Sequence, residues 1–63
     1  MSTDRAELSS IATQLGELGR RIGAAGERLD RYPTDDAAAS LFEVERALRT
    51  AERSLTRALT QLD

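Results

Sequence analysis

Apolar residues alternate at spacings of three and four along both halves of this 63-residue chain, and the only proline, Pro33, separates the halves. Such spacing places the apolar side chains along one stripe of an α-helix, as in coiled coils. A proline disfavours helical conformation in the residue before it, and Thr34 followed by Asp35 and Asp36 is typical of a helix start. The pattern therefore predicts two long helices joined by a short turn.

The chain is expected to form one domain over residues 1–63. The first helix is predicted over about residues 4–31, the turn over residues 32–34 and the second helix over about residues 35–62. Because the connection is so short, two helices of this length are forced to lie antiparallel. The predicted fold class is therefore all-α, an antiparallel helical hairpin.

The apolar stripes of the two predicted helices define their expected contact. We call these residues the apolar seam: Leu8, Ile11, Leu15, Leu18, Ile22, Leu29, Leu41, Val44, Leu48, Leu55, Leu59 and Leu62. Pairing the helices outward from the turn brings Ile22 near Val44. The same pairing brings Leu18 near Leu48, so apolar residues are expected to meet apolar residues along the whole hairpin.

All four glycines lie in the first predicted helix, although each costs about 1 kcal/mol relative to alanine in a helix interior. They form a second stripe, one residue out of phase with the apolar seam, and the second helix carries a similar row of small residues. The predicted close-packing interface comprises Ala12, Gly16, Gly19, Gly23, Gly26, Ala47, Ala51, Ser54 and Ala58. Small residues let two backbones approach closely, so we expect this interface to receive a helix from another chain. Compositional drift and a glycine-lined ligand groove are the alternatives.

A chain this small usually needs a further source of stability, and its composition leaves self-association as the available one. It has no cysteine for disulfides, and no cysteine or histidine for the usual zinc sites. A homodimer that forms a four-helix bundle is the simplest arrangement, because a two-fold axis lets one surface serve both subunits. We therefore expect a homo-oligomer, with a dimer as the first choice.

Phe42 lies about 100° from the apolar seam of the second helix, on the side that carries a row of arginines. The candidate partner surface comprises Phe42, Arg46, Arg49, Arg53 and Arg57. An aromatic residue beside arginines is typical of protein hot spots and of nucleic-acid stacking sites, and packing of the ring on arginine stems is the structural alternative. Residues 46–57 hold four arginines and one glutamate, a net charge of +3, which suits either phosphate contacts or a solvated helix face.

Two glutamates, Glu45 and Glu52, border the apolar seam, where we expect them to pair with arginine and to set the register of the helices. A di-metal site of the helical-bundle kind would also need histidine, which the chain lacks. The chain also lacks lysine and cysteine, so no side chain is recognisable as a base that activates a hydroxyl. We therefore expect no catalytic, cofactor or metal site.

The first residues are polar, and no stretch approaches the roughly 20 apolar residues of a membrane span, which predicts a cytoplasmic protein without membrane contact. The sequence predicts a non-enzymatic interaction module that homodimerises and presents a surface to a protein partner, as an adaptor, scaffold or regulator. The layout resembles that of small plasmid RNA-regulating hairpins of the Rop type, although no residue of their binding face maps onto this chain. That resemblance in architecture implies the alternative, a dimeric RNA- or DNA-binding regulator that uses the arginines of the second helix.

Overall fold

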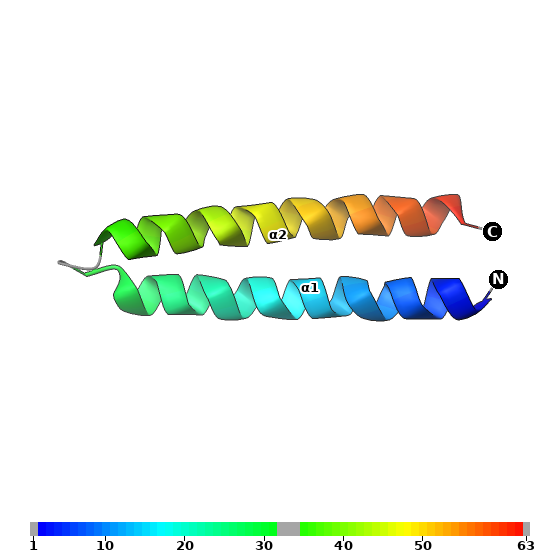
Figure 1. The fold of residues 1–63 in the computed structure, drawn as a ribbon, viewed down its shortest axis with the longest axis horizontal. Coiled ribbons are helices and arrows are strands. Elements are labelled where there is room, and N and C mark those ends of the chain that lie inside the picture. The colour runs from blue at the N-terminus through cyan, green and yellow to red at the C-terminus, as the bar shows by residue number, and fades with distance from the viewer. Residues whose placement is uncertain (1, 32–34, 63) are drawn as a thin grey trace.

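The computed structural model of the protein describes residues 2–31 and 35–62. Two helices, α1 (Ser2–Leu29) and α2 (Asp35–Gln61), lie side by side and antiparallel, with both ends of the chain at the same end of the hairpin (Figure 1). The predicted all-helical hairpin is confirmed. Both helix boundaries agree with the prediction to within two residues, and the predicted turn at residues 32–34 lies outside the described residues.

One hydrogen bond closes the last turn of α1, and another joins the two helices at the open end of the hairpin. Next to the turn, the Asp30 N–H donates to the Glu27 carbonyl at 3.4 Å, a spacing of three residues that tightens the last turn of α1. At the open end, the Arg5 guanidinium of α1 donates to the Leu62 carbonyl at 2.7 Å. This bond joins the start of α1 to the end of α2 and satisfies a carbonyl that the helix itself leaves without a partner.

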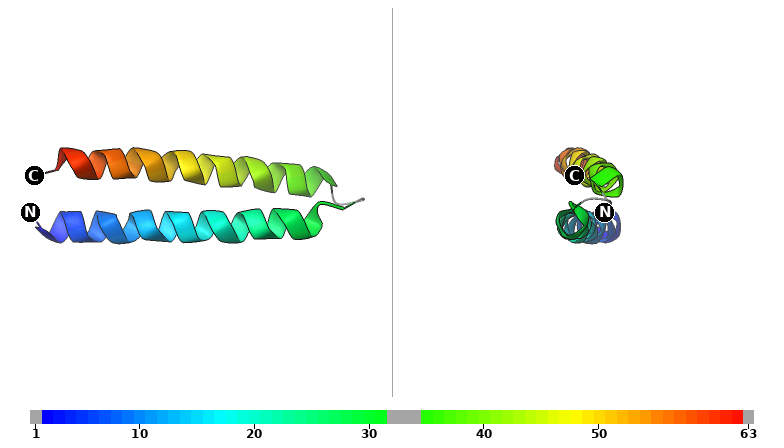
Figure 2. Two further views of the ribbon diagram at one scale, coloured as in Figure 1. Left: turned by 180° about the vertical axis from the view of Figure 1, so that it is seen from behind. Right: turned by 90° about the vertical axis from the view of Figure 1, so that its left-hand side faces the viewer.

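The hairpin is a single layer of two helices and is long and narrow. Its Cα atoms extend over 50 × 14 × 9 Å, and the end-on view in Figure 2 shows the two helices lying against each other. Each helix therefore covers only one side of the other. Among the described residues, the buried positions are Ala38 of α2 and three glycines of α1, Gly19, Gly23 and Gly26.

The buried glycines mark the side of α1 that faces α2. A Cβ atom at Gly19 would lie 3.8 Å from Cβ of Leu48, and one at Gly16 would lie 2.8 Å from Oε2 of Glu52. Farther toward the turn, Gly23 faces Glu45. The residue numbers of these facing pairs add to 67 or 68, which fixes the register of the hairpin.

This arrangement corrects two expectations from the sequence. The glycine stripe was expected to receive a helix from another chain, but α2 of the same chain lies on it. The apolar seam was expected to join the helices, but Leu48 faces Gly19 rather than Leu18, and Val44 is 44% exposed rather than covered by Ile22. The physical reason is that glycine leaves notches in α1, and the larger side chains of α2 fill them.

Candidate interaction surfaces

The apolar seam is only partly covered in the hairpin. Its half-buried members are Leu8, Leu15, Ile22, Leu41, Leu48, Leu55 and Leu59. Its exposed members are Ile11 (37% exposed), Leu18 (44%), Leu29 (39%), Val44 (44%) and Leu62 (38%). Five large apolar side chains in so small a protein are thus substantially open to solvent.

The exposed apolar residues of both helices lie on one side of the hairpin. Leu18 directly precedes the inward residue Gly19, and Val44 directly precedes the inward residue Glu45, so each lies about 100° from the contact between the helices. In two antiparallel helices, the residues that precede the inward positions fall on the same side. We call this side the apolar face: Ile11, Leu18, Ala25 and Leu29 of α1 with Val44, Ala51, Ala58 and Leu62 of α2. These residues are uncharged, and Arg21 and Arg28 line a hollow on the same side together with Leu18 and Ala25.

The small residues of α2 that were predicted to pack closely belong to this side and not to the contact with α1. Ala47, Ala51 and Ser54 are exposed, and Ala58 is half-buried. Ala12, the remaining member of the predicted close-packing interface, is half-buried in α1. Of that predicted interface, the structure therefore brings the glycines into contact with α2 and leaves most of the α2 residues open.

The opposite side of the hairpin is polar because the residues that follow the inward positions are mostly charged or hydroxylated. We call it the polar face: Thr13, Glu17, Arg20 and Glu27 of α1 with Arg46, Arg49, Arg53, Thr56 and Thr60 of α2, all exposed. Arg20 pairs with Glu17 at 3.2 Å, and Arg49 pairs with Glu45 at 2.6 Å. The hairpin therefore has one side on which the exposed large apolar residues gather and an opposite side that is mostly charged or hydroxylated.

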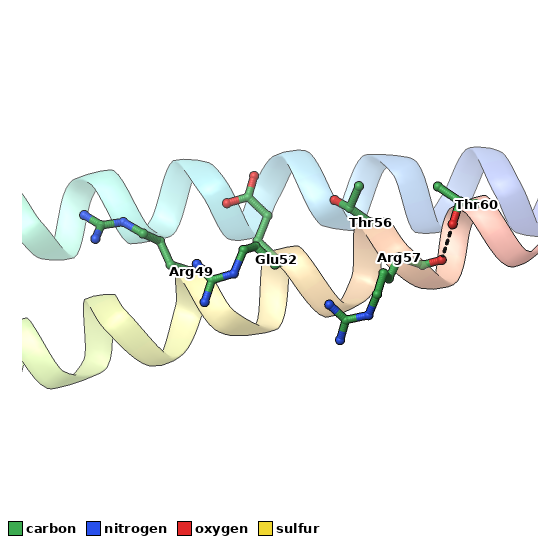
Figure 3. A pocket seen from close by; sticks show the side chains of 6 residues that line it. Arg49, Glu52, Thr56, Arg57 and Thr60 are labelled. Carbon is green, nitrogen blue, oxygen red and sulfur yellow. Dashed lines mark hydrogen bonds between the residues drawn. The ribbon is translucent and has the colours of Figure 1, made fainter.

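A groove runs along the polar side of α2 (Figure 3). Its lining residues are Arg49, Glu52, Arg53, Thr56, Arg57 and Thr60. Arg53 donates to the Thr50 hydroxyl at 3.3 Å, and Arg57 donates to the Ser54 hydroxyl at 3.2 Å. These hydrogen bonds run along α2 itself, so both guanidinium groups keep further N–H donors for another molecule.

Phe42 is separated from the arginines with which it was grouped. Its side chain is half-buried, and its ring lies against Gly26, where an added Cβ would come within 2.6 Å of Cε1. Arg46, by contrast, is exposed, as are the other three arginines of the candidate partner surface. The structure thus places the ring against Gly26 in the contact between α1 and α2, which neither a partner surface nor packing on arginine stems predicts, and places the arginines at the surface.

The two glutamates expected at the border of the apolar seam enter the notches of α1. The Glu52 carboxylate lies against Gly16, and the Glu45 carboxylate lies against Gly23. The Glu45 side chain is 21% exposed and accepts the hydrogen bond from Arg49. A small cavity remains between the helices at this level, lined by Leu15, Gly16, Gly19, Arg20, Glu45, Arg49 and Glu52. Sequence reasoning missed these notches, although each glycine stands opposite a larger residue once the helices are paired in register.

The described residues show no set of metal ligands and no membrane-spanning helix, and the chain matches no known protein in the comparisons made. Over residues 2–31 and 35–62, no three His, Cys, Asp or Glu side chains come together as a set of metal ligands. Neither α1 nor α2, as described, is long and apolar enough to cross a membrane. Comparison of the chain with protein families, with curated proteins and with solved structures gives no match. The two faces of the hairpin are therefore its candidate interaction surfaces.

Proposed function

We propose that this chain is a non-enzymatic helical interaction module that pairs with a second copy of itself through the apolar face and offers its polar face to a protein partner. The observation that carries the proposal is the apolar face itself. Leu18 and Val44, near its centre, are each 44% exposed, and Arg21 and Arg28 line a hollow beside Leu18 and Ala25. Contiguous exposed apolar surface on a small protein is typical of interaction sites.

The accessible surface area of the hairpin supports self-association. It is 4813 Å², whereas a monomeric protein of 6.9 kDa is expected to expose about 4,000 Å². The excess of roughly 800 Å² equals the area that one partner contributes to an interface of standard size. A second copy is the simplest partner that would cover it, because a two-fold axis lets the same face serve both chains.

The charge distribution favours an acidic protein segment as the partner of the polar face. Residues 46–57 carry a net charge of +3, while the whole chain carries −2, so the rest of the chain carries −5. A basic strip on an otherwise acidic protein complements a short acidic segment. The negative charge of the rest of the chain would instead repel the continuous phosphate backbone of a nucleic acid.

Self-association is tested by sedimentation and circular dichroism over a hundredfold dilution. We expect a dimer that loses helix as it dissociates, since one hairpin alone has a small core. Replacing both Leu18 and Val44 with glutamine should weaken the dimer at least tenfold, because each buried apolar side chain contributes about 1.5–3 kcal/mol. The matched control, Arg20→Gln with Arg53→Gln on the polar face, should leave the dimer unchanged. A wild-type chain that stays monomeric at every concentration would contradict the proposal.

The partner class is tested with two probes of equal charge, an acidic helical peptide and a short RNA duplex. We expect the hairpin to bind the peptide more tightly. Binding should be lost when Arg49, Arg53 and Arg57 are replaced with glutamine, and it should persist when Arg21 and Arg28 of α1 are replaced. Tighter RNA binding that falls steadily with added salt would favour the nucleic-acid regulator instead.

A further inference from the structure

We infer that Arg53 and Arg57 of α2 anchor the acidic partner segment. Arg49 and Arg20 lie on the same polar face but contribute little, because each already has a glutamate partner within the hairpin. This inference rests on the proposed partner class and adds the residues that carry the binding. It follows from the way in which the hairpin pairs its own charges.

Two arginines of the polar face are already paired. The Arg49 guanidinium donates to the Glu45 carboxylate at 2.6 Å, and the Glu45 side chain is only 21% exposed. On α1, Arg20 pairs with Glu17 at 3.2 Å. A carboxylate of a partner would have to compete with these two glutamates, whose charge offsets that of the arginines, so little attraction for it is left at either position.

Arg53 and Arg57 are in a different situation. Over residues 2–31 and 35–62, neither has a carboxylate within ion-pair distance. Arg53 donates to the Thr50 hydroxyl and Arg57 to the Ser54 hydroxyl, each three residues earlier along α2. A neutral hydroxyl does not offset the charge of a guanidinium, so both arginines keep a full positive charge and further N–H donors for another molecule.

The groove along α2 brings these two arginines together. Both line it, and because they stand four residues apart, their Cα atoms are separated by about 6 Å along the helix axis. Thr56 and Thr60 line the groove as well and are uncharged. Glu52 is the only acidic residue of the lining, and Figure 3 shows its carboxylate directed toward α1, where it lies against Gly16. An acidic segment in the groove therefore meets two guanidinium groups that no carboxylate of the hairpin occupies.

Single substitutions in the full-length chain test which arginines bind. The probe is a labelled, capped synthetic helix rich in glutamate, and its affinity is measured by fluorescence anisotropy at one low salt concentration, because salt screens exposed pairs. Arg53→Gln and Arg57→Gln should each weaken binding about threefold, and the double variant about tenfold. Arg49→Gln removes the same charge from the same groove, yet it should weaken binding by less than about 1.5-fold.

Releasing Arg49 from its glutamate should create a third anchor. Glu45→Gln keeps the shape of the side chain but removes its charge, so Arg49 becomes free to bind the probe, and affinity should rise about threefold. The gain should disappear when Glu45→Gln is combined with Arg49→Gln. The matched control is Glu43→Gln, which removes the same charge from α2 without releasing an arginine and should leave affinity nearly unchanged.

Two results would overturn the assignment of the anchors and leave the partner class standing. One is an equal loss of affinity in Arg49→Gln and Arg53→Gln. The other is a gain in Glu43→Gln as large as that in Glu45→Gln, because only the net charge of the chain would then matter. A dimer weakened by Arg53→Gln with Arg57→Gln would also overturn the assignment, since a second copy would then occupy the groove. A wild-type chain that does not bind the probe would overturn the proposed partner class itself.

Discussion

Gly26 of α1 lies opposite the ring of Phe42 in α2, and a Cβ atom at Gly26 would come within 2.6 Å of Cε1 of that ring. Gly16 stands in the same relation to Glu52, with a closest distance of 2.8 Å. Gly19 differs, because a Cβ atom there would make an ordinary contact of 3.8 Å with Leu48. The glycines are therefore not equivalent: most are notches filled by a side chain of α2, and Gly19 is not.

Replacing Gly26 with alanine should lower the free energy of unfolding by about 1 kcal/mol. Alanine favours the helix by about 1 kcal/mol relative to glycine, but forcing the Phe42 ring out of its notch costs about 1–3 kcal/mol of overpacking. Urea denaturation followed by circular dichroism, at one fixed protein concentration, measures the difference. A more stable Gly26→Ala variant would show that the ring does not fill the notch.

Replacing Gly19 with alanine should have the opposite effect and raise the free energy of unfolding by about 1 kcal/mol. The new methyl group would meet only Cβ of Leu48 at ordinary contact distance, so the gain in helix propensity is not offset. The same denaturation experiment applies, with Gly26→Ala as the matched comparison. If Gly19→Ala were destabilising, α2 would have to lie closer to α1 than the structure places it.

The notch at Gly16 should be energetically coupled to Glu52. In the wild-type chain, Gly16→Ala requires the flexible Glu52 carboxylate to move aside, so we expect a change in the free energy of unfolding of less than about 0.5 kcal/mol. In the Glu52→Ala background the notch is empty, and the full gain of about 1 kcal/mol should appear. A double-mutant cycle measures the coupling. Additive effects would mean that the carboxylate does not occupy the notch.

Much of the fold follows from the pattern of the sequence. The spacing of apolar residues on both sides of Pro33 predicts two helices, and the short connection between them predicts their antiparallel arrangement. The predicted end of the first helix, residue 31, lies two residues beyond the observed end at Leu29. These features depend on local propensity and periodicity, which a single sequence carries.

The inward side of each helix could not be predicted in the same way. Leu18 and Gly19 lie on adjacent stripes of α1, and periodicity alone does not say which stripe faces the neighbouring helix. On hydropathy alone, Leu18 is the residue expected at the contact with α2. The contact is made instead by the glycine stripe, because its notches accept the Phe42 ring and also two carboxylates, which a hydropathy scale assigns to the surface. Glu45 is the clearest case, because a charged residue is expected at the surface and its side chain is mostly covered. Pairing each glycine with the residue opposite it would have revealed this.

The bond from Arg5 to the Leu62 carbonyl should stabilise the open end of the hairpin locally. The guanidinium satisfies the last described carbonyl after α2 and places positive charge at the negative end of the helix dipole, an effect of about 0.5 kcal/mol for an exposed group. Arg5→Gln should therefore raise the amide hydrogen exchange rate of Leu62 and its neighbours about twofold, while the exchange of central amides stays unchanged. Arg28→Gln, at the turn end of α1, is the control and should leave exchange at Leu62 as in the wild type. Equal exchange in the Arg5→Gln variant and the wild type would show that this bond does not hold the two ends together in solution.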